Sequence, residues 1–336
     1  MEKFNKSYIF GISMVSAMGG LLFGYDWVVI GGAKPFYERF FDIVGMPALQ
    51  AWAMSSALIG CIIGAVSSGL ISDKYGRKMP LLLAAALFTI SALGTGLVSN
   101  FNFFIAYRML GGIGIGLASA LSPMYIAEVS PAKMRGGFVS LNQLTIVIGI
   151  LAAQIINMLI AQEVPLGATD AFIKASWNGQ MGWRWMFMAE TIPAFLFFVL
   201  VFFVPESPRW LVKAGKPAKA LPTLVKIGGD VYARNEMSEI EATLKNASSK
   251  IDLRILLKPK FRKVLILGVF LAVFQQWCGI NTVFNYADEI FTAAGYGVSD
   301  MLFNIVITGT VNLVFTLVAM FTVDKWGRKK LMLFGA

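Results

Sequence analysis

The chain contains no histidine and only two cysteines among its 336 residues. Without histidine, the helical zinc-protease motif, in which two histidines bind the metal, is excluded. Cys61 and Cys278 both fall within long apolar segments and form no Cys-x-x-Cys pair, so we expect no disulfide, no metal site and no cofactor. The Gly-x-Ser-x-Gly pattern of serine hydrolases and the Gly-x-Gly-Asp pattern of intramembrane aspartyl proteases are also absent. We therefore expect that the protein is not an enzyme.

Charged residues are scarce as well, at 14% of the chain, whereas soluble domains contain about a quarter. The mean hydropathy is +0.69. Uncharged runs of about 20 residues are long enough to cross a bilayer as helices, and a helix satisfies its own backbone hydrogen bonds there. We predict an all-α polytopic membrane protein whose spans lie near 8–33, 51–72, 79–98, 102–125, 137–161, 184–204, 264–290 and 301–323, with a ninth beginning at 331–336.

The 29 Lys and Arg residues are distributed unevenly between the two sides of this pattern. Most lie at the N-terminus, after the second, fourth and sixth predicted spans, and after the eighth. The opposite side holds Lys34, Arg39 and Lys174. Because basic residues are enriched on the cytoplasmic side, we expect a cytoplasmic N-terminus and a location in the cell (inner) membrane. The net charge of +10 is then explained by topology and by attraction to anionic lipid head groups, so we expect no nucleic-acid partner.

One charged hexapeptide occurs twice, as DKYGRK at 73–78 and as DKWGRK at 324–329. Each copy falls between the second and third predicted spans of a six-span unit, which indicates two parallel repeats. We predict an N-terminal six-helix bundle over 1–205, a cytoplasmic helical linker over 206–263 and a partial C-terminal bundle over 264–336. By symmetry we expect about eight of twelve helices here, so that the sequence is a fragment that ends before the second repeat is complete.

Further segments, in the same order, resemble motifs of one transporter family. They are GGLLFGYD (19–26), YRMLGGIGIGLASALSPMYIAEVSPAKMRG (107–136), PESPRWL (205–211) and QQWCGIN (275–281). With the two hexapeptides, they make the whole chain similar to the sugar porter family of the major facilitator superfamily, and in particular to bacterial proton–sugar symporters of the xylose type. The resemblance implies the major facilitator fold, a sugar site at mid-membrane between two six-helix bundles, and alternating access. The expected partners are a monosaccharide, protons and the lipid bilayer, for a monomeric protein.

One aspartate, Asp26, lies deep in the first predicted span. A carboxylate inside the membrane is costly and indicates function by default. Arg108, early in the fourth span, is the expected partner, because an opposite charge stabilises the carboxylate. The resemblance implies that Asp26 carries the coupled proton, since passive sugar carriers have a neutral residue at this place. A static structural ion pair is the alternative.

Amide side chains in the seventh predicted span suit a sugar, because amides donate and accept hydrogen bonds without carrying a charge. Gly279 weakens the helix here and predicts a break in it. Trp27 and Asn285 depart from the family pattern, which leaves the identity of the sugar open. Hydrogen bonding between helices is the alternative for each amide. The resemblance implies sugar-binding positions at Gln143, Gln275, Gln276, Asn281 and Asn312, and aromatic lining at Phe23 and Tyr286.

The resemblance also implies a gating network at the cytoplasmic edge, where Arg–carboxylate pairs can hold neighbouring helices together. Ordinary loop charge is the alternative. Gly76 and Gly327 are expected to form tight turns within the two hexapeptides. The network is expected to contain Asp73, Arg77, Glu128, Arg135, Glu206, Arg209, Asp324 and Arg328, and Glu190 in the sixth span is assigned to gating as well.

Three other interpretations remain to be weighed. The run GGIGIG at 111–116 lies inside an apolar helix and follows no strand, so close helix packing explains it better than a dinucleotide site. A channel would show a ring of repeated filter residues, which we do not find in the sequence. A passive sugar uniporter of the same fold is the main alternative to a proton symporter, and Asp26 is the residue that argues against it.

Overall fold

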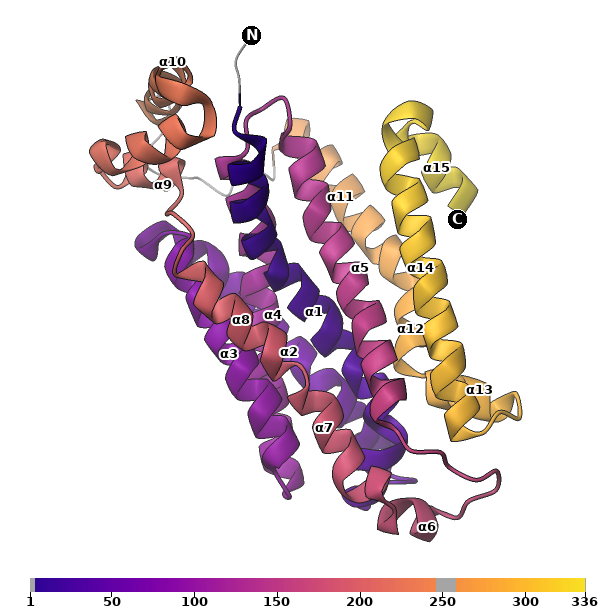
Figure 1. Cartoon of the computed structure of the whole chain (residues 1–336). Coiled ribbons are helices and arrows are strands. Elements are labelled where there is room, and N and C mark those ends of the chain that lie inside the picture. The colour runs from indigo at the N-terminus through magenta and orange to yellow at the C-terminus, as the bar shows by residue number, and fades with distance from the viewer. Residues whose placement is uncertain (1–3, 246–257, 336) are drawn as a thin grey trace.

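The computed structural model describes residues 4–245 and 258–335, and every regular element within these ranges is a helix. Figure 1 shows long, roughly antiparallel helices, with the N-terminus, α9 and α10 at one end and α6 and α13 at the other. The first group of helices comprises α1 (Lys6–Phe40), α2 (Pro47–Tyr75), α3 (Lys78–Leu97), α4 (Phe101–Val129), α5 (Arg135–Ile160), α6 (Asp170–Ala175), the π-helix η1 (Asn178–Gly182), α7 (Trp183–Met188) and α8 (Thr191–Val201).

The remaining helices follow a connecting region. This region carries α9 (Pro208–Lys213) and α10 (Pro217–Lys245), which is interrupted at Gly229. We refer to α1–α8 as the first unit and to α11–α15 as the second unit. The end that holds α9 and α10 is called the linker end, and the opposite end is called the α6 end. The second unit consists of α11 (Pro259–Trp277), α12 (Ile280–Asn285), α13 (Ala287–Ala293), α14 (Val298–Trp326) and α15 (Arg328–Gly335).

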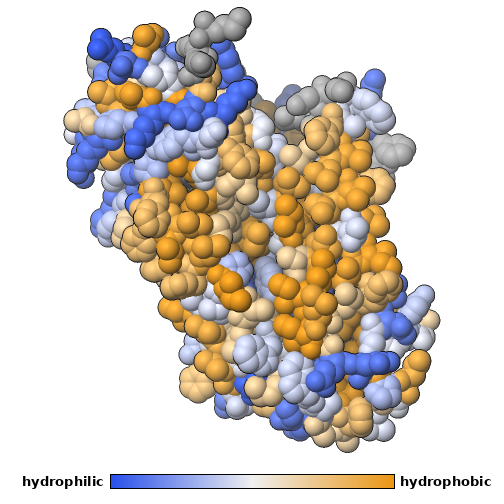
Figure 2. Space-filling model, in the orientation of Figure 1, coloured by the Kyte–Doolittle hydropathy of each residue, from blue (hydrophilic) through white to orange (hydrophobic). Residues whose placement is uncertain are grey.

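Seven helical segments within the described ranges are long and apolar enough to cross a membrane. Figure 2 shows hydrophobic residues across the middle of one face and hydrophilic residues gathered toward its two ends. This distribution fits a bilayer, which surrounds the middle of the helices and leaves both ends in water. The chain is thus a multi-pass membrane protein. The seven segments are Lys6–Phe40, Pro47–Tyr75, Lys78–Leu97, Phe101–Val129, Arg135–Ile160, Asn178–Val201 and Val298–Thr322.

The seventh predicted span is the one that differs most from a single helix. The sequence suggested a break at Gly279, and the structure confirms it: Gly279 has a φ of 83° and separates α11 from α12. A second interruption at Tyr286 separates α12 from α13. Glycine adopts this left-handed conformation without the steric cost that a Cβ would bring. One helix of 19 residues and two short helices therefore replace the continuous segment predicted over 264–290.

Two other boundaries were predicted incorrectly. The first span was expected to end at residue 33, but α1 continues through Pro35 to Phe40. The sixth span was expected to begin at residue 184, whereas the helical segment begins with the π-helix at Asn178. The predicted boundaries left out these helical residues because charged residues near 34–39 and 184 interrupt the apolar runs.

Helices α2 and α4 pack against each other closely because glycines line their contact. A Cβ on Gly112 would overlap the carbonyl oxygen of Ala57, and a Cβ on Gly116 would overlap that of Cys61. On the opposite helix, Gly60 faces the backbone at Met109 in the same way. This contact explains the run GGIGIG as a packing surface, as predicted from the sequence.

We expect Gly112→Val to destabilise the first unit by about 1–3 kcal/mol, because two backbones would have to separate to admit the side chain. Thermal unfolding of the detergent-solubilised protein measures this effect. The matched control is Gly69→Val on α2, where a Cβ meets no atom within 4 Å. Equal unfolding temperatures for the two variants would contradict the close contact of α2 and α4.

Contacts between the two units gather at the α6 end. Helix α14 packs along α5, and α12 and α13 contact α1. Among the side chains that the structure describes in the second unit, the buried ones lie in this region and are Phe284, Ala287, Met301, Leu302 and Ile305. Toward the linker end, by contrast, each side chain from Phe261 to Cys278 on and just after α11 is exposed. The units are therefore joined at the α6 end and less closely packed toward the linker end.

Candidate functional site

Asp26 and Arg108 form an ion pair inside the first unit. Both residues are buried, with exposed fractions of 3% and 2%. Arg108 Nη1 donates to Asp26 Oδ1, and both terminal nitrogens of Arg108 lie 3.4 Å from the Asp26 carbonyl oxygen. The guanidinium also lies over the Phe187 ring, 5.6 Å from its centre. The expected pairing is present, so the charge of the buried carboxylate is compensated.

A second carboxylate, Glu190, lies beside this pair. It sits between α7 and α8, is 1% exposed, and interacts electrostatically with both Asp26 and Arg108. With both carboxylates ionised, the three residues carry one excess negative charge. A buried excess charge is costly, and one proton would remove it. From the sequence we expected Glu190 to take part in gating. Its position brings it to the Asp26–Arg108 pair and away from the charged loops.

Two of the predicted sugar-binding amides are in contact. Asn281 Nδ2 donates to Gln276 Oε1 at 2.7 Å. The break at Gly279 separates the two residues, so Asn281 begins a new helix while its side chain reaches back to α11. Gln275 and Gln276 are both exposed, and their amide groups are therefore accessible to a solute.

The other predicted sugar-binding residues lie on α1, α5 and α14 and at the end of α12. Phe23 on α1 packs edge-to-face against Trp27, with ring centres 6.3 Å apart. A Cβ on Gly24 would overlap the carbonyl oxygen of Ile146, which places Phe23 at nearly the same depth as Gln143 on α5. Gln143 is exposed and Asn312 on α14 is half-buried, while Tyr286, at the end of α12, is exposed. No direct hydrogen bond joins these four side chains to the Gln276–Asn281 pair in the described part of the chain.

Sequence reasoning missed two buried amides on α5, Gln154 and Asn157, which are 2% and 1% exposed. Asn157 Nδ2 donates to the carbonyl oxygen of Val29 on α1 at 3.0 Å. Gln154 lies directly against Gly309 of α14, where a Cβ would overlap its amide. Both are polar residues in the same apolar segment as Gln143, and this could have marked them as candidates. The sequence of that segment does not show which neighbouring helix each polar side chain faces.

Several of the charged residues that the sequence grouped together are in contact at the linker end. Arg77 donates two hydrogen bonds to Glu128, of 2.9 and 2.8 Å. Glu206 accepts the backbone N–H groups of Arg77 and Lys78 at the start of α3, so its carboxylate caps a helix terminus, where negative charge is favoured. Asp73 lies in the last turn of α2 and pairs with Lys213 at 2.9 Å.

Two expected members of this network, Arg135 and Arg209, stay outside it, and two others cannot be placed. Arg135 and Arg209 form no ion pair within the described part of the chain. The side chains of Asp324 and Arg328 lie outside the described residues. Gly76 and Gly327 adopt φ values of 88° and 83°, which confirms the tight turn in both hexapeptides.

Comparisons with known proteins agree with this fold. The profile of the family described as "Sugar (and other) transporter" matches residues 12–336. The chain is 41% identical over 358 aligned residues to the D-xylose-proton symporter of Escherichia coli (strain K12), covering 99% of this chain and 70% of that protein. It is 39% identical to the arabinose-proton symporter of Bacillus subtilis (strain 168), covering 98% of this chain and 68% of that protein.

A solved structure is also similar. It is that of the xylose transporter XylE from E. coli in a partially occluded inward open conformation, with a TM-score of 0.83 and 40% identity over 96% of this chain and 75% of that one. The similarity therefore holds in both sequence and three-dimensional structure over nearly the whole chain. The chain belongs to the sugar (and other) transporter family and has the major facilitator fold of its relatives.

Proposed function

We propose that the protein is a proton-coupled monosaccharide symporter that works by alternating access. The observation that carries this proposal is the buried Asp26–Arg108 ion pair with Glu190 beside it, in a family whose similar members are named as proton symporters for xylose and arabinose. The charge distribution supports a cytoplasmic N-terminus and a location in the inner membrane.

In this proposal the proton acts on the buried ion pair. A proton on Asp26 removes the charge that holds Arg108, and the guanidinium is then free to engage Glu190. The three side chains come from α1, α4 and the α7–α8 segment, so a change of partner alters the packing of several helices at once. Proton binding and movement of the first unit thereby become linked.

The sugar is proposed to bind between the two units, at the exposed amides of α11–α12 and the facing residues of α1, α5 and α14. Residues 1–205 and 264–336 would then act as the two moving parts, joined by the linker at 206–263. Contact between the units at the α6 end, with looser packing toward the linker end, supports a state open toward the linker end. With a cytoplasmic N-terminus, the linker end faces the cytoplasm, so this is the inward-open state. In this state Arg77, Glu128 and Glu206 join helices within the first unit.

A passive uniporter of the same fold is the alternative that we considered from the sequence. It gives no role to a carboxylate buried inside the membrane, which is costly to retain. The similar relatives named above are proton symporters. Both considerations favour symport.

The test is uptake of labelled D-xylose and L-arabinose into proteoliposomes that contain the full-length protein. With an imposed gradient of one pH unit and one proton per sugar, we expect accumulation of up to about tenfold, because one pH unit is equivalent to a tenfold concentration ratio. A protonophore should reduce the ratio to one. Uptake that never exceeds the outside concentration, at any imposed gradient, would identify a uniporter instead.

A further inference from the structure

Lys34 occupies an unusual position near the α6 end of α1. Its side chain is 3% exposed, although lysine is almost never fully buried unless it is paired. The sequence placed it among the basic residues outside the membrane, on the side opposite to most of the positive charge. The structure instead places it within α1, one residue before Pro35 and among the contacts between the two units.

Three groups surround the Lys34 ammonium. Nζ donates to Glu289 Oε1 on α13 and lies 5.0 Å from the centre of the Tyr286 ring. On its own helix, Glu38 Oε1 lies 3.9 Å away, one turn further along. Gln50, at the start of α2, donates to the other oxygen of Glu38 at 2.8 Å, which fixes that carboxylate to the first unit.

The two carboxylates differ in the unit to which they belong. Glu38 is carried by α1, as Lys34 is, so their separation does not depend on how the units are arranged. Glu289 is carried by α13 in the second unit, so the Lys34–Glu289 contact exists only while the units are joined at the α6 end. Glu289 is also half-exposed, with 51% of its side chain accessible, and can return to water when the contact breaks.

From this arrangement we propose that Lys34 is a gating residue whose ion pair with Glu289 holds the α6 end closed, and that Glu38 becomes its sole partner when that end opens. This proposal rests on the alternating-access mechanism proposed above. A buried cation without a counter-charge is strongly unfavourable. A second carboxylate on the same helix removes that penalty, so the gate can open without leaving Lys34 unpaired.

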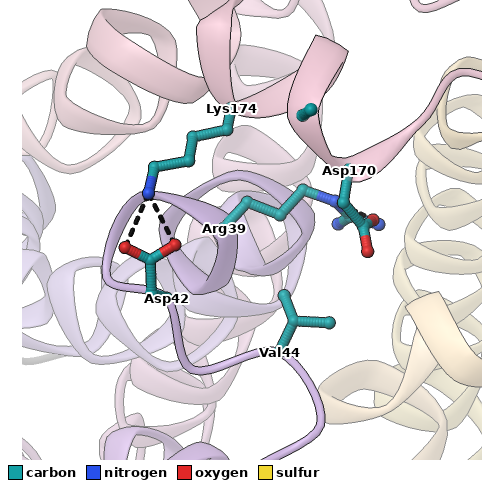
Figure 3. Close-up of a pocket in the computed structure, with 6 residues that line it drawn as sticks. Arg39, Asp42, Val44, Asp170 and Lys174 are labelled. Atoms are coloured by element: carbon teal, nitrogen blue, oxygen red, sulfur yellow. Dashed lines mark hydrogen bonds and ion pairs between the residues drawn. The ribbon is translucent and has the colours of Figure 1, made fainter.

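Other ion pairs at the same end do not have this property. Arg39 pairs with Asp170 at 2.8 Å, and Lys174 pairs with Asp42 at 2.5 Å. Figure 3 shows these four side chains around a surface pocket formed where the end of α1 meets α6. All four belong to the first unit, so these pairs persist whichever end is open. They provide matched controls for the Lys34 gate.

The experiment measures the access of a thiol reagent to each end of the full-length protein, with Cys61 and Cys278 replaced by serine. Leu302→Cys reports on the α6 end, because Leu302 is 4% exposed at the contact between the units. Gly136→Cys reports on the linker end, because it lies on α5 two turns before Gln143 and a Cβ there meets no atom within 4 Å. Labelling is followed in membranes without sugar and without a proton gradient.

In this background, Glu289→Gln is expected to raise the labelling rate of Leu302→Cys about three- to tenfold and to lower that of Gly136→Cys, as the loss of one ion pair shifts the balance of states. Glu38→Gln removes the alternate partner, and both reporters should change in the opposite direction. Asp170→Asn, the control, should leave both rates unchanged.

Opposite changes at the two ends distinguish gating from loss of structure, because a merely destabilised protein would expose both reporters. Unchanged rates in Glu289→Gln, or a rise at both ends, would overturn the proposal. The readout needs neither sugar nor proton transport. If the reporters respond while sugar accumulation fails, the proposed function is wrong and the Lys34 gate stands.

Discussion

Asp26→Asn is expected to abolish accumulation of sugar against a gradient in the full-length protein. The amide keeps the shape of the carboxyl group but cannot bind and release a proton, so it imitates the protonated state permanently. Arg108 then keeps only Glu190 as its counter-charge, and sugar movement is no longer linked to the proton. A membrane potential contributes about 2.3 kcal/mol per charge per 100 mV, and the variant would lose this driving force completely.

Proteoliposomes measure two quantities that separate coupling from binding. With an imposed pH gradient, the Asp26→Asn variant should reach only the outside sugar concentration. Exchange of labelled for unlabelled sugar should continue, because the predicted sugar-binding amides lie on other helices. Asp300→Asn, the same chemical change at an exposed position on α14, should accumulate sugar normally. If Asp26→Asn still concentrates sugar, Asp26 does not carry the coupled proton and the uniporter interpretation gains support.

Removal of either amide of the Gln276–Asn281 pair is expected to weaken sugar binding by about 1–3 kcal/mol, or roughly five- to 150-fold in affinity, because a bound hydroxyl would lose its hydrogen-bond partner. Since the two side chains contact each other at 2.7 Å, the double variant should lose less than the sum of the two single variants. Calorimetric titration with the transported sugar gives these affinities.

The control for this prediction is Asn304→Ala on α14, whose amide donates to the backbone of its own helix at Asp300. It should bind sugar with unchanged affinity. Gln276→Ala and Asn281→Ala variants that remain folded and bind sugar as tightly as the parent protein would show that this amide pair joins the two helices and does not contact the substrate.

Features set by the local chain were predictable from the sequence. The break at Gly279 and the turns at Gly76 and Gly327 follow from the left-handed conformation that glycine alone adopts cheaply, and each has a positive φ. Pairing of Asp26 with Arg108 was also predictable, because these two charges lie well inside neighbouring apolar segments and neither can remain uncompensated there.

Features set by packing between distant segments were not predictable. Several arginines could have met Glu128, and only the placement of α3 beside the end of α4 selects Arg77. The first span was predicted to end before Lys34 because charges normally mark the membrane boundary. Lys34 and Glu38 nevertheless lie inside α1, since Glu289 pairs with Lys34 and Gln50 donates a hydrogen bond to Glu38. Glu289 lies 255 positions from Lys34 in the sequence, so no local pattern reveals this pairing.

The cap that Glu206 forms on α3 also has an evolutionary consequence. Its carboxylate accepts hydrogen bonds from the main chain at Arg77 and Lys78, and not from their side chains. Every amino acid except proline supplies that N–H group, so the cap alone leaves the side chain at residue 78 free to vary. Glu206 has no such latitude, because the cap requires an acceptor of its length and charge. Residue 76 is equally restricted, since a Cβ there would overlap the Glu206 carboxylate. We therefore expect residue 78 to tolerate many substitutions, and residues 76 and 206 to tolerate few.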